Sequence, residues 1–169
     1  MDTFWLAISA VSSALSVFCA GVSALILFVT ALIIRSELEE VRKANYANAY
    51  KAARDILQAE DLRQARDTVM NVLANKPFES FQSWNDQEIA EARKVCQSFD
   101  SVGQMIRSGM LPTASIADSW GAPLRETWRI LSPMVVAFRA KINATEYWDD
   151  YEWLAKQAEG FQRPLHKNK

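Results

Sequence analysis

A long uncharged apolar segment near the start of the chain restricts the possible folds more than any other feature of the sequence. Between Thr3 and Ile34 there is no Asp, Glu, Lys or Arg. About 20 apolar residues cross the hydrocarbon core of a bilayer as a helix, and this segment is longer. It contains no glycine–proline or asparagine–glycine turn that would divide it into two crossings. The sequence therefore predicts one transmembrane helix over residues 1–35.

A cleaved signal peptide is the main alternative for this segment. Signal peptides begin with basic residues and have a short apolar core, whereas this chain begins MDTFW and its apolar run is long. A lipoprotein signal would place a small residue before the modified cysteine, but Phe18 precedes Cys19. We therefore expect an anchor that stays on the protein and contacts the lipid bilayer.

The distribution of Lys and Arg predicts how this helix is oriented. The N-terminal side of the segment has neither residue, whereas Arg35, Arg42, Lys43 and Lys51 follow it. Basic residues flanking a membrane helix favour the cytoplasmic side. We expect the N-terminus outside and the C-terminal domain in the cytoplasm.

Small residues recur along the predicted membrane helix. One face carries a small residue at every fourth position, and Gly21 belongs to a second series with a spacing of seven. Small side chains let helix backbones approach closely in lipid. The predicted packing residues are Ser12, Ser16, Ala20, Gly21 and Ala24. The partner is either a second copy or another membrane protein; the alternative is a simple anchor with an incidental Ala and Ser bias.

The border between the apolar and charged regions is predicted to be a continuous helical stalk over residues 36–45. An apolar stripe formed by Ile34, Leu38 and Val41 keeps helical spacing across this border, which predicts a contact site there. Ser36 and Glu39 have the spacing of a capping box, which would instead begin a new helix.

The remaining sequence predicts a small all-α cytoplasmic domain of about five helices over residues 46–161, followed by a flexible basic tail over residues 162–169. Apolar residues repeat with helical periodicity throughout. Asn85 and Glu88 predict a capped helix start, and Gly109 a helix end. We expect Gly121 to separate a short helix from a longer one, and Pro133 to kink or split the longer one near Leu131.

Charge and residue usage exclude several classes of function. After Ile34 the numbers of basic and acidic residues are both 19, so we expect no general nucleic-acid binding, which needs a basic surface. The single histidine, His166, lies in the tail, and no glycine-rich phosphate loop is present. We therefore expect no enzyme activity, no metal and no cofactor. A weaker alternative is an enzyme that uses the carboxylates of Asp149, Asp150 and Glu152.

Two arginines one helical turn apart form the strongest candidate binding site. Arg125 and Arg129 flank Trp128, and Trp148 follows in an acidic, aromatic segment. These four residues predict an anion or partner pocket, because arginine binds anions with several donors. The alternative is that the arginines pair with the acidic residues of 146–153 over an aromatic core.

Three segments of this chain carry a resemblance to a known family. They are ARDILQAEDLRQARDTV, CQSFDSVGQMIRSGMLPTASIADSW running into LRETWRILSPMV, and YWDDYEWLAKQA. The chain resembles a family of uncharacterised bacterial proteins that pair an N-terminal membrane helix with a small helical cytoplasmic domain. The resemblance implies the bacterial inner membrane but no activity or ligand.

These patterns lead to one functional hypothesis and one alternative. We expect a non-enzymatic single-pass membrane protein that is an accessory subunit or scaffold of a membrane assembly. The alternative is a membrane-tethered sensor or effector, in stress or phage response, that binds an anionic ligand near Arg125 and Arg129.

Overall fold

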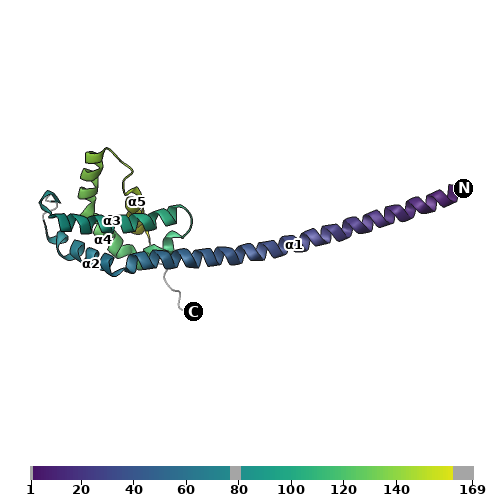
Figure 1. The fold of residues 1–169 in the computed structure, drawn as a ribbon, viewed down its shortest axis with the longest axis horizontal. Helices are drawn as coiled ribbons and strands as arrows, with labels where there is room; N and C mark the ends of the chain where they lie inside the picture. Colours follow the sequence, from purple (N-terminus) through teal and green to yellow (C-terminus); the bar gives the residue numbers. More distant parts are fainter. Residues whose placement is uncertain (1, 77–80, 162–169) are drawn as a thin grey trace. The chain divides into compact units, whose positions relative to one another are not determined.

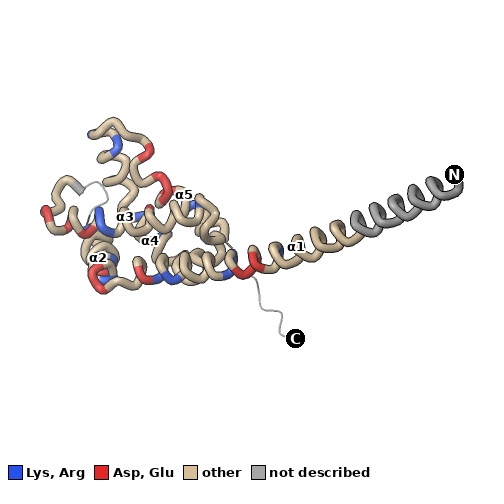
Figure 2. Tube along the Cα trace, turned by 45° about the vertical axis from the view of Figure 1, so that its right-hand side comes forward, with Lys and Arg blue, Asp and Glu red and all other residues tan. Residues whose placement is uncertain are grey.

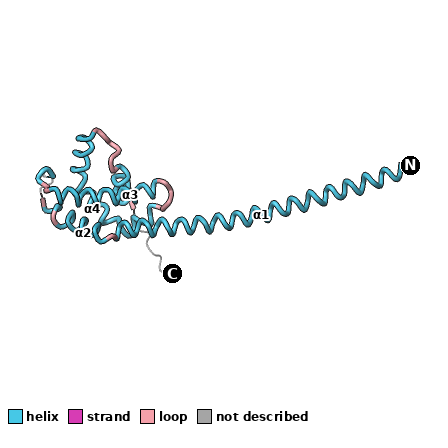
Figure 3. The backbone as a smooth tube through the Cα atoms, viewed as in Figure 1, coloured by secondary structure: helices cyan, strands magenta, loops and turns pink. Residues whose placement is uncertain are grey.

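The computed structural model describes the backbone of residues 2–76 and 81–161, and the side chains of residues 21–76 and 82–161. Every regular element in these ranges is a helix (Figures 1 and 3). The α-helices are α1 (Asp2–Gln58), α2 (Glu60–Asn71), α3 (Asp86–Arg107), α4 (Thr113–Ile142) and α5 (Asp149–Gly160), and the 3-10 turns are η1 (Leu73–Asn75) and η2 (Phe81–Ser83). The predicted all-α fold class is confirmed. The predicted tail, 162–169, lies outside the described residues.

Helix α1 continues across the border between apolar and charged residues. The Ser36 hydroxyl donates a hydrogen bond back to the Ile33 carbonyl at 2.8 Å, which is an interaction inside a helix and not a cap. The predicted continuity of the helix at this point is confirmed. The chain consists of two compact units, residues 1–44 and residues 45–169, and the second contains the hydrophobic core.

A buried arginine stabilises the corner between α1 and α2. Ala59 has extended backbone angles, so the helical path ends at Gln58 and begins again at Glu60. The Arg66 guanidinium donates to the Leu57 carbonyl at 2.6 Å and lies 4.9 Å from the centre of a Trp120 ring. It thus satisfies a carbonyl that the end of α1 would leave without a helical partner.

The start of α3 is the capping box that its sequence predicts. The Asn85 side chain accepts from the Glu88 backbone N–H, and the Glu88 carboxylate accepts from the Asn85 N–H, both at 2.9 Å. Lys76 adds a salt bridge of 2.7 Å to the same carboxylate. At the other end, Gly109 has φ of +80°, a left-handed conformation that glycine adopts readily, and it follows the helix as expected.

Helix α4 corrects the sequence prediction in two places. It runs as one helix through Gly121 and Pro133. The expected separation at Gly121 is therefore wrong, and of the two alternatives for Pro133 the split near Leu131 is wrong, whereas a kink stays a prediction. Leu131 and Val135 on either side of the proline are fully buried. Their burial offsets the roughly 3 kcal/mol that an internal proline costs a helix. At Gly121 an added Cβ would lie 3.9 Å from the Ala158 Cβ of α5, which is an ordinary packing distance, so α5 lies directly against this part of α4.

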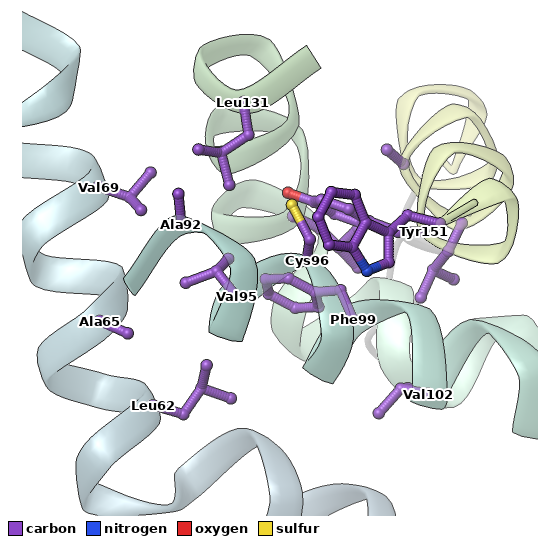
Figure 4. Close-up of a cluster of buried hydrophobic side chains, with 14 of the residues drawn as sticks. Leu62, Ala65, Val69, Ala92, Val95, Cys96, Phe99, Val102, Leu131 and Tyr151 are labelled. Atoms are coloured by element: carbon purple, nitrogen blue, oxygen red, sulfur yellow. The ribbon is translucent and has the colours of Figure 1, made fainter. Parts of the chain in front are cut away.

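The core of the second unit lies between α2, α3, α4 and α5 (Figure 4), and Ala53 and Leu57 from the end of α1 are buried in it as well. Tyr151 at its centre is fully buried, stacks on Phe99 with ring centres 5.3 Å apart, and meets Trp128 edge to face at 5.0 Å. Its hydroxyl donates to the hydroxyl oxygen of Thr127 at 2.7 Å, so the buried phenol has a polar partner. Such aromatic pairs contribute beyond their buried area, and they join α3, α4 and α5.

Candidate functional site

The apolar stretch of α1 leaves large hydrophobic side chains exposed on all sides. Consecutive residues on an α-helix point in directions about 100° apart, so four in a row cover its whole circumference. The run Leu25, Ile26, Leu27 and Phe28 is between 59% and 70% exposed. Figure 2 shows that charged residues begin along α1 only after this uncharged stretch. A helix that is apolar all round needs either a protein core or a membrane around it.

This helix is long and apolar enough to cross a membrane. Gly21 and Ala24 of the predicted packing face are exposed, and a Cβ at Gly21 would meet nothing within 4 Å. The side chains of the other predicted packing residues, Ser12, Ser16 and Ala20, lie outside the described residues. Membrane packing through this face stays a prediction.

The predicted stalk contact is exposed as well. Ile34, Leu38 and Val41 are 50%, 52% and 54% exposed, which is high for large aliphatic side chains in water. The ion pair of Glu39 in this region is with Arg35 at 3.7 Å, on the preceding helical turn. The stalk therefore presents apolar side chains next to a salt-bridged face.

The side chains of the two candidate arginines point to separate partners. Arg125 donates to the Ala158 carbonyl of α5 at 2.9 Å. Arg129 binds Glu126 on its own helix at 2.6 Å, and this pair is largely exposed. Glu126 holds the pKa of Arg129 above its usual value through hydrogen bonding, and Arg129 lowers the pKa of Glu126 in turn.

The two candidate tryptophans lie against different aromatic groups. Trp128 packs against Tyr151, whereas Trp148 stacks on Phe138 with ring centres 5.5 Å apart and contacts Tyr147 at 4.5 Å. Trp148 is 4% exposed, and Trp128 is partly buried. The four candidate residues are thus distributed over several contacts, and an anion pocket made from them together stays a prediction.

Acidic residues of 146–153 do pair with arginines, but their partners are not the predicted Arg125 and Arg129. Arg107 at the end of α3 binds Asp149 at 2.8 Å and Asp150 at 2.7 Å. Arg139 binds Glu152 at 2.6 Å. No local pattern pointed to Arg107, because 42 residues separate it from Asp149 and the pair depends on how α3 meets α5.

Three carboxylates, one from α3 and two from the start of α5, form the closest approach to a metal site in the described part of the chain. Ligand atoms of Asp100, Asp149 and Asp150 lie within 4.8 Å of one another. Asp100 accepts a hydrogen bond from the Tyr151 N–H at 3.1 Å, while partial burial raises its pKa. Arg107 already supplies a cation to the other two. These contacts explain the cluster as a cap on α5, where negative charge is favourable at the helix start.

The buried cysteine and tyrosine of the core are unsuited to nucleophilic chemistry. Cys96 is a free, fully buried cysteine, and burial raises the pKa of its thiol. Burial likewise raises the pKa of the Tyr151 phenol. A thiol or phenol that stays protonated is a poor nucleophile, so both side chains are structural.

The fold and these surfaces define an all-helical protein with one long apolar helix at its N-terminal end. Residues 11–158 match a family described as "Domain of unknown function (DUF4760)". Because the match covers most of the sequence, the chain belongs to this family. Searches of curated proteins and of solved structures gave no significant match.

Proposed function

We propose that this chain is a single-pass membrane protein and a non-enzymatic accessory subunit or scaffold of a membrane assembly. The observation that carries the proposal is the apolar stretch of α1, whose side chains are exposed from Val22 to Ile34. In water this surface would favour aggregation, whereas a bilayer covers it without any protein partner.

The orientation in this proposal places the helical domain in the bacterial cytoplasm. Arg35, Arg42 and Lys43 follow the apolar stretch directly, and basic residues near the end of a membrane helix are retained on the cytoplasmic side. Protease added to sealed, inverted membrane vesicles should then digest the domain. Complete protection of the domain in these vesicles would reverse the orientation.

The partner surface in this proposal is the small-residue face of the membrane helix together with the stalk. Gly21 and Ala24 allow close helix packing, and Leu38 and Val41 extend an exposed apolar stripe beyond the membrane. A partner helix that follows both segments would cover this stripe. The partner is a second copy of the chain or another membrane protein.

Two matched double variants separate membrane insertion from assembly. Leu15→Arg with Phe18→Arg places two charges near the middle of the apolar run and leaves no uncharged stretch of 20 residues, and each charge costs about 2.5–3.5 kcal/mol near the centre of a membrane helix. We expect this variant to be extracted from membranes by alkaline carbonate. Leu38→Arg with Val41→Arg makes the same type of change in the stalk, and we expect it to stay in the membrane but leave its complex.

To detect the complex, the chain is expressed at its native level and extracted in mild detergent, and the mass of the extracted particle is measured. A wild-type chain that alkaline carbonate extracts would refute the membrane assignment. A wild-type monomer would refute the accessory or scaffold role, even if the chain stays in the membrane.

A further inference from the structure

A cavity of about 420 Å³ lies between α3, the C-terminal half of α4 and the residue before α5. Ile89 and Arg93 of α3 line one side, Phe138 and Lys141 of α4 line another, and Trp148 completes the wall. All of these residues belong to the second compact unit. The volume lies within the range of about 300–1,000 Å³ that is typical of small-molecule sites.

The apolar wall of this cavity is held in place by aromatic packing. Phe138 and Trp148 stack with ring centres 5.5 Å apart, and Tyr147 contacts both rings. Trp148 has φ of +59°, a left-handed conformation that is uncommon for a large side chain. Its side chain lines the cavity, and its buried indole N–H has no acceptor in the described part of the chain.

The charged residues that line the cavity are both cations. The Arg93 guanidinium lies 4.6 Å from the centre of the Phe138 ring, and Lys141 lies one turn further along α4. Among the described residues no acidic side chain lines the cavity, and neither cation has a hydrogen bond or ion pair with any of them. Arg139 and Lys156 of the same unit differ from them, since both bind Glu152.

We propose that this cavity binds a small organic anion, namely a carboxylate attached to an apolar aromatic or aliphatic body. The carboxylate would bind Arg93 and Lys141, because charge-assisted hydrogen bonds to carboxylates are the strong ones. The apolar body would lie against Phe138, Ile89 and Trp148. This inference does not depend on the membrane proposal, since every residue involved lies outside the apolar stretch of α1.

Calorimetric titration of the full chain in nanodiscs of neutral lipid tests the inference. The probes are 2-naphthoate and decanoate, which carry an aromatic and an aliphatic body, and the neutral comparison is 2-naphthalenemethanol. We expect at least one carboxylate to bind, and the neutral alcohol to bind about tenfold more weakly. The acid that binds more tightly shows whether the cavity prefers an aromatic or an aliphatic body.

Three variants locate the binding. Arg93→Gln with Lys141→Gln should weaken carboxylate binding by about tenfold or more. Ala137→Phe places a ring in the cavity without changing a charge, and it should abolish binding. The matched control, Arg63→Gln with Lys156→Gln, removes two surface cations that do not line the cavity and should bind like the wild type.

The inference fails if neither acid binds the wild-type chain. It also fails if the acids bind the Arg93/Lys141 variant and the control variant equally well. Since Arg93 and Lys141 are both exposed side chains, their replacement should preserve the fold, which circular dichroism would verify.

Discussion

The contact between α3 and α5 depends on a glycine at their closest approach. A Cβ added to Gly103 would lie 2.5 Å from the backbone oxygen of Asp150 and 2.8 Å from its carbonyl carbon. Backbone atoms cannot rotate away as a side chain can. The start of α5 is also held by the Tyr151 N–H, which donates to Asp100 at 3.1 Å. Gly103→Ala must therefore push α5 away from α3.

The expected cost of this substitution combines two opposing effects. Overpacking a close contact costs about 1–3 kcal/mol. Alanine recovers up to about 1 kcal/mol, because it is a better helix former than glycine. We expect Gly103→Ala to lower the free energy of unfolding by about 1–2 kcal/mol. For a unit of this size the melting temperature should fall by roughly 3–10 °C.

Gly121→Ala is the matched control for this experiment. Gly121 is also buried inside a helix, but its added Cβ would meet only the Arg125 Nη1 atom at 3.3 Å and the Ala158 Cβ at 3.9 Å. The Arg125 side chain is flexible, so this variant should be unchanged or up to about 1 kcal/mol more stable. The stability of both variants is measured by thermal unfolding of the full chain in detergent, monitored by far-ultraviolet circular dichroism. Equal stability of the two variants would refute the argument from close packing.

Two further substitutions test the core and the capping box. Tyr151→Phe keeps the aromatic packing but loses the 2.7 Å hydrogen bond to Thr127, so urea unfolding should show a loss of about 1 kcal/mol, and an unchanged value would contradict the role of this bond. Hydrogen bonds from Lys76 and from the Asn85 N–H lower the pKa of Glu88. Ionised Glu88 therefore stabilises the fold fully above the ordinary glutamate pKa, and this stabilisation is lost as the pH falls through the lowered pKa. Urea midpoints measured at decreasing pH should therefore fall more steeply below about pH 4.5 in the wild type than in Glu88→Gln, and parallel curves would contradict this assignment.

The sequence determined the features that depend on interactions between near neighbours. The helical class, the capping box of Asn85 and Glu88 and the helix end at Gly109 all rest on contacts within about five residues. The apolar stretch of α1 is likewise a property of consecutive residues, so its length and lack of charge could be read directly.

Tertiary structure decided the features that depend on residues far apart in the chain. Local rules predicted a separation at Gly121 and either a kink or a split near Pro133, but packing of α4 against α5 keeps one helix through both positions. Arg107 pairs with Asp149 across 42 residues, and spacing alone cannot reveal such a pair. Arg93 and Lys141 line one cavity because α3 and α4 meet in the fold. The lining residues come from separate segments, so no local sequence pattern could reveal this cavity.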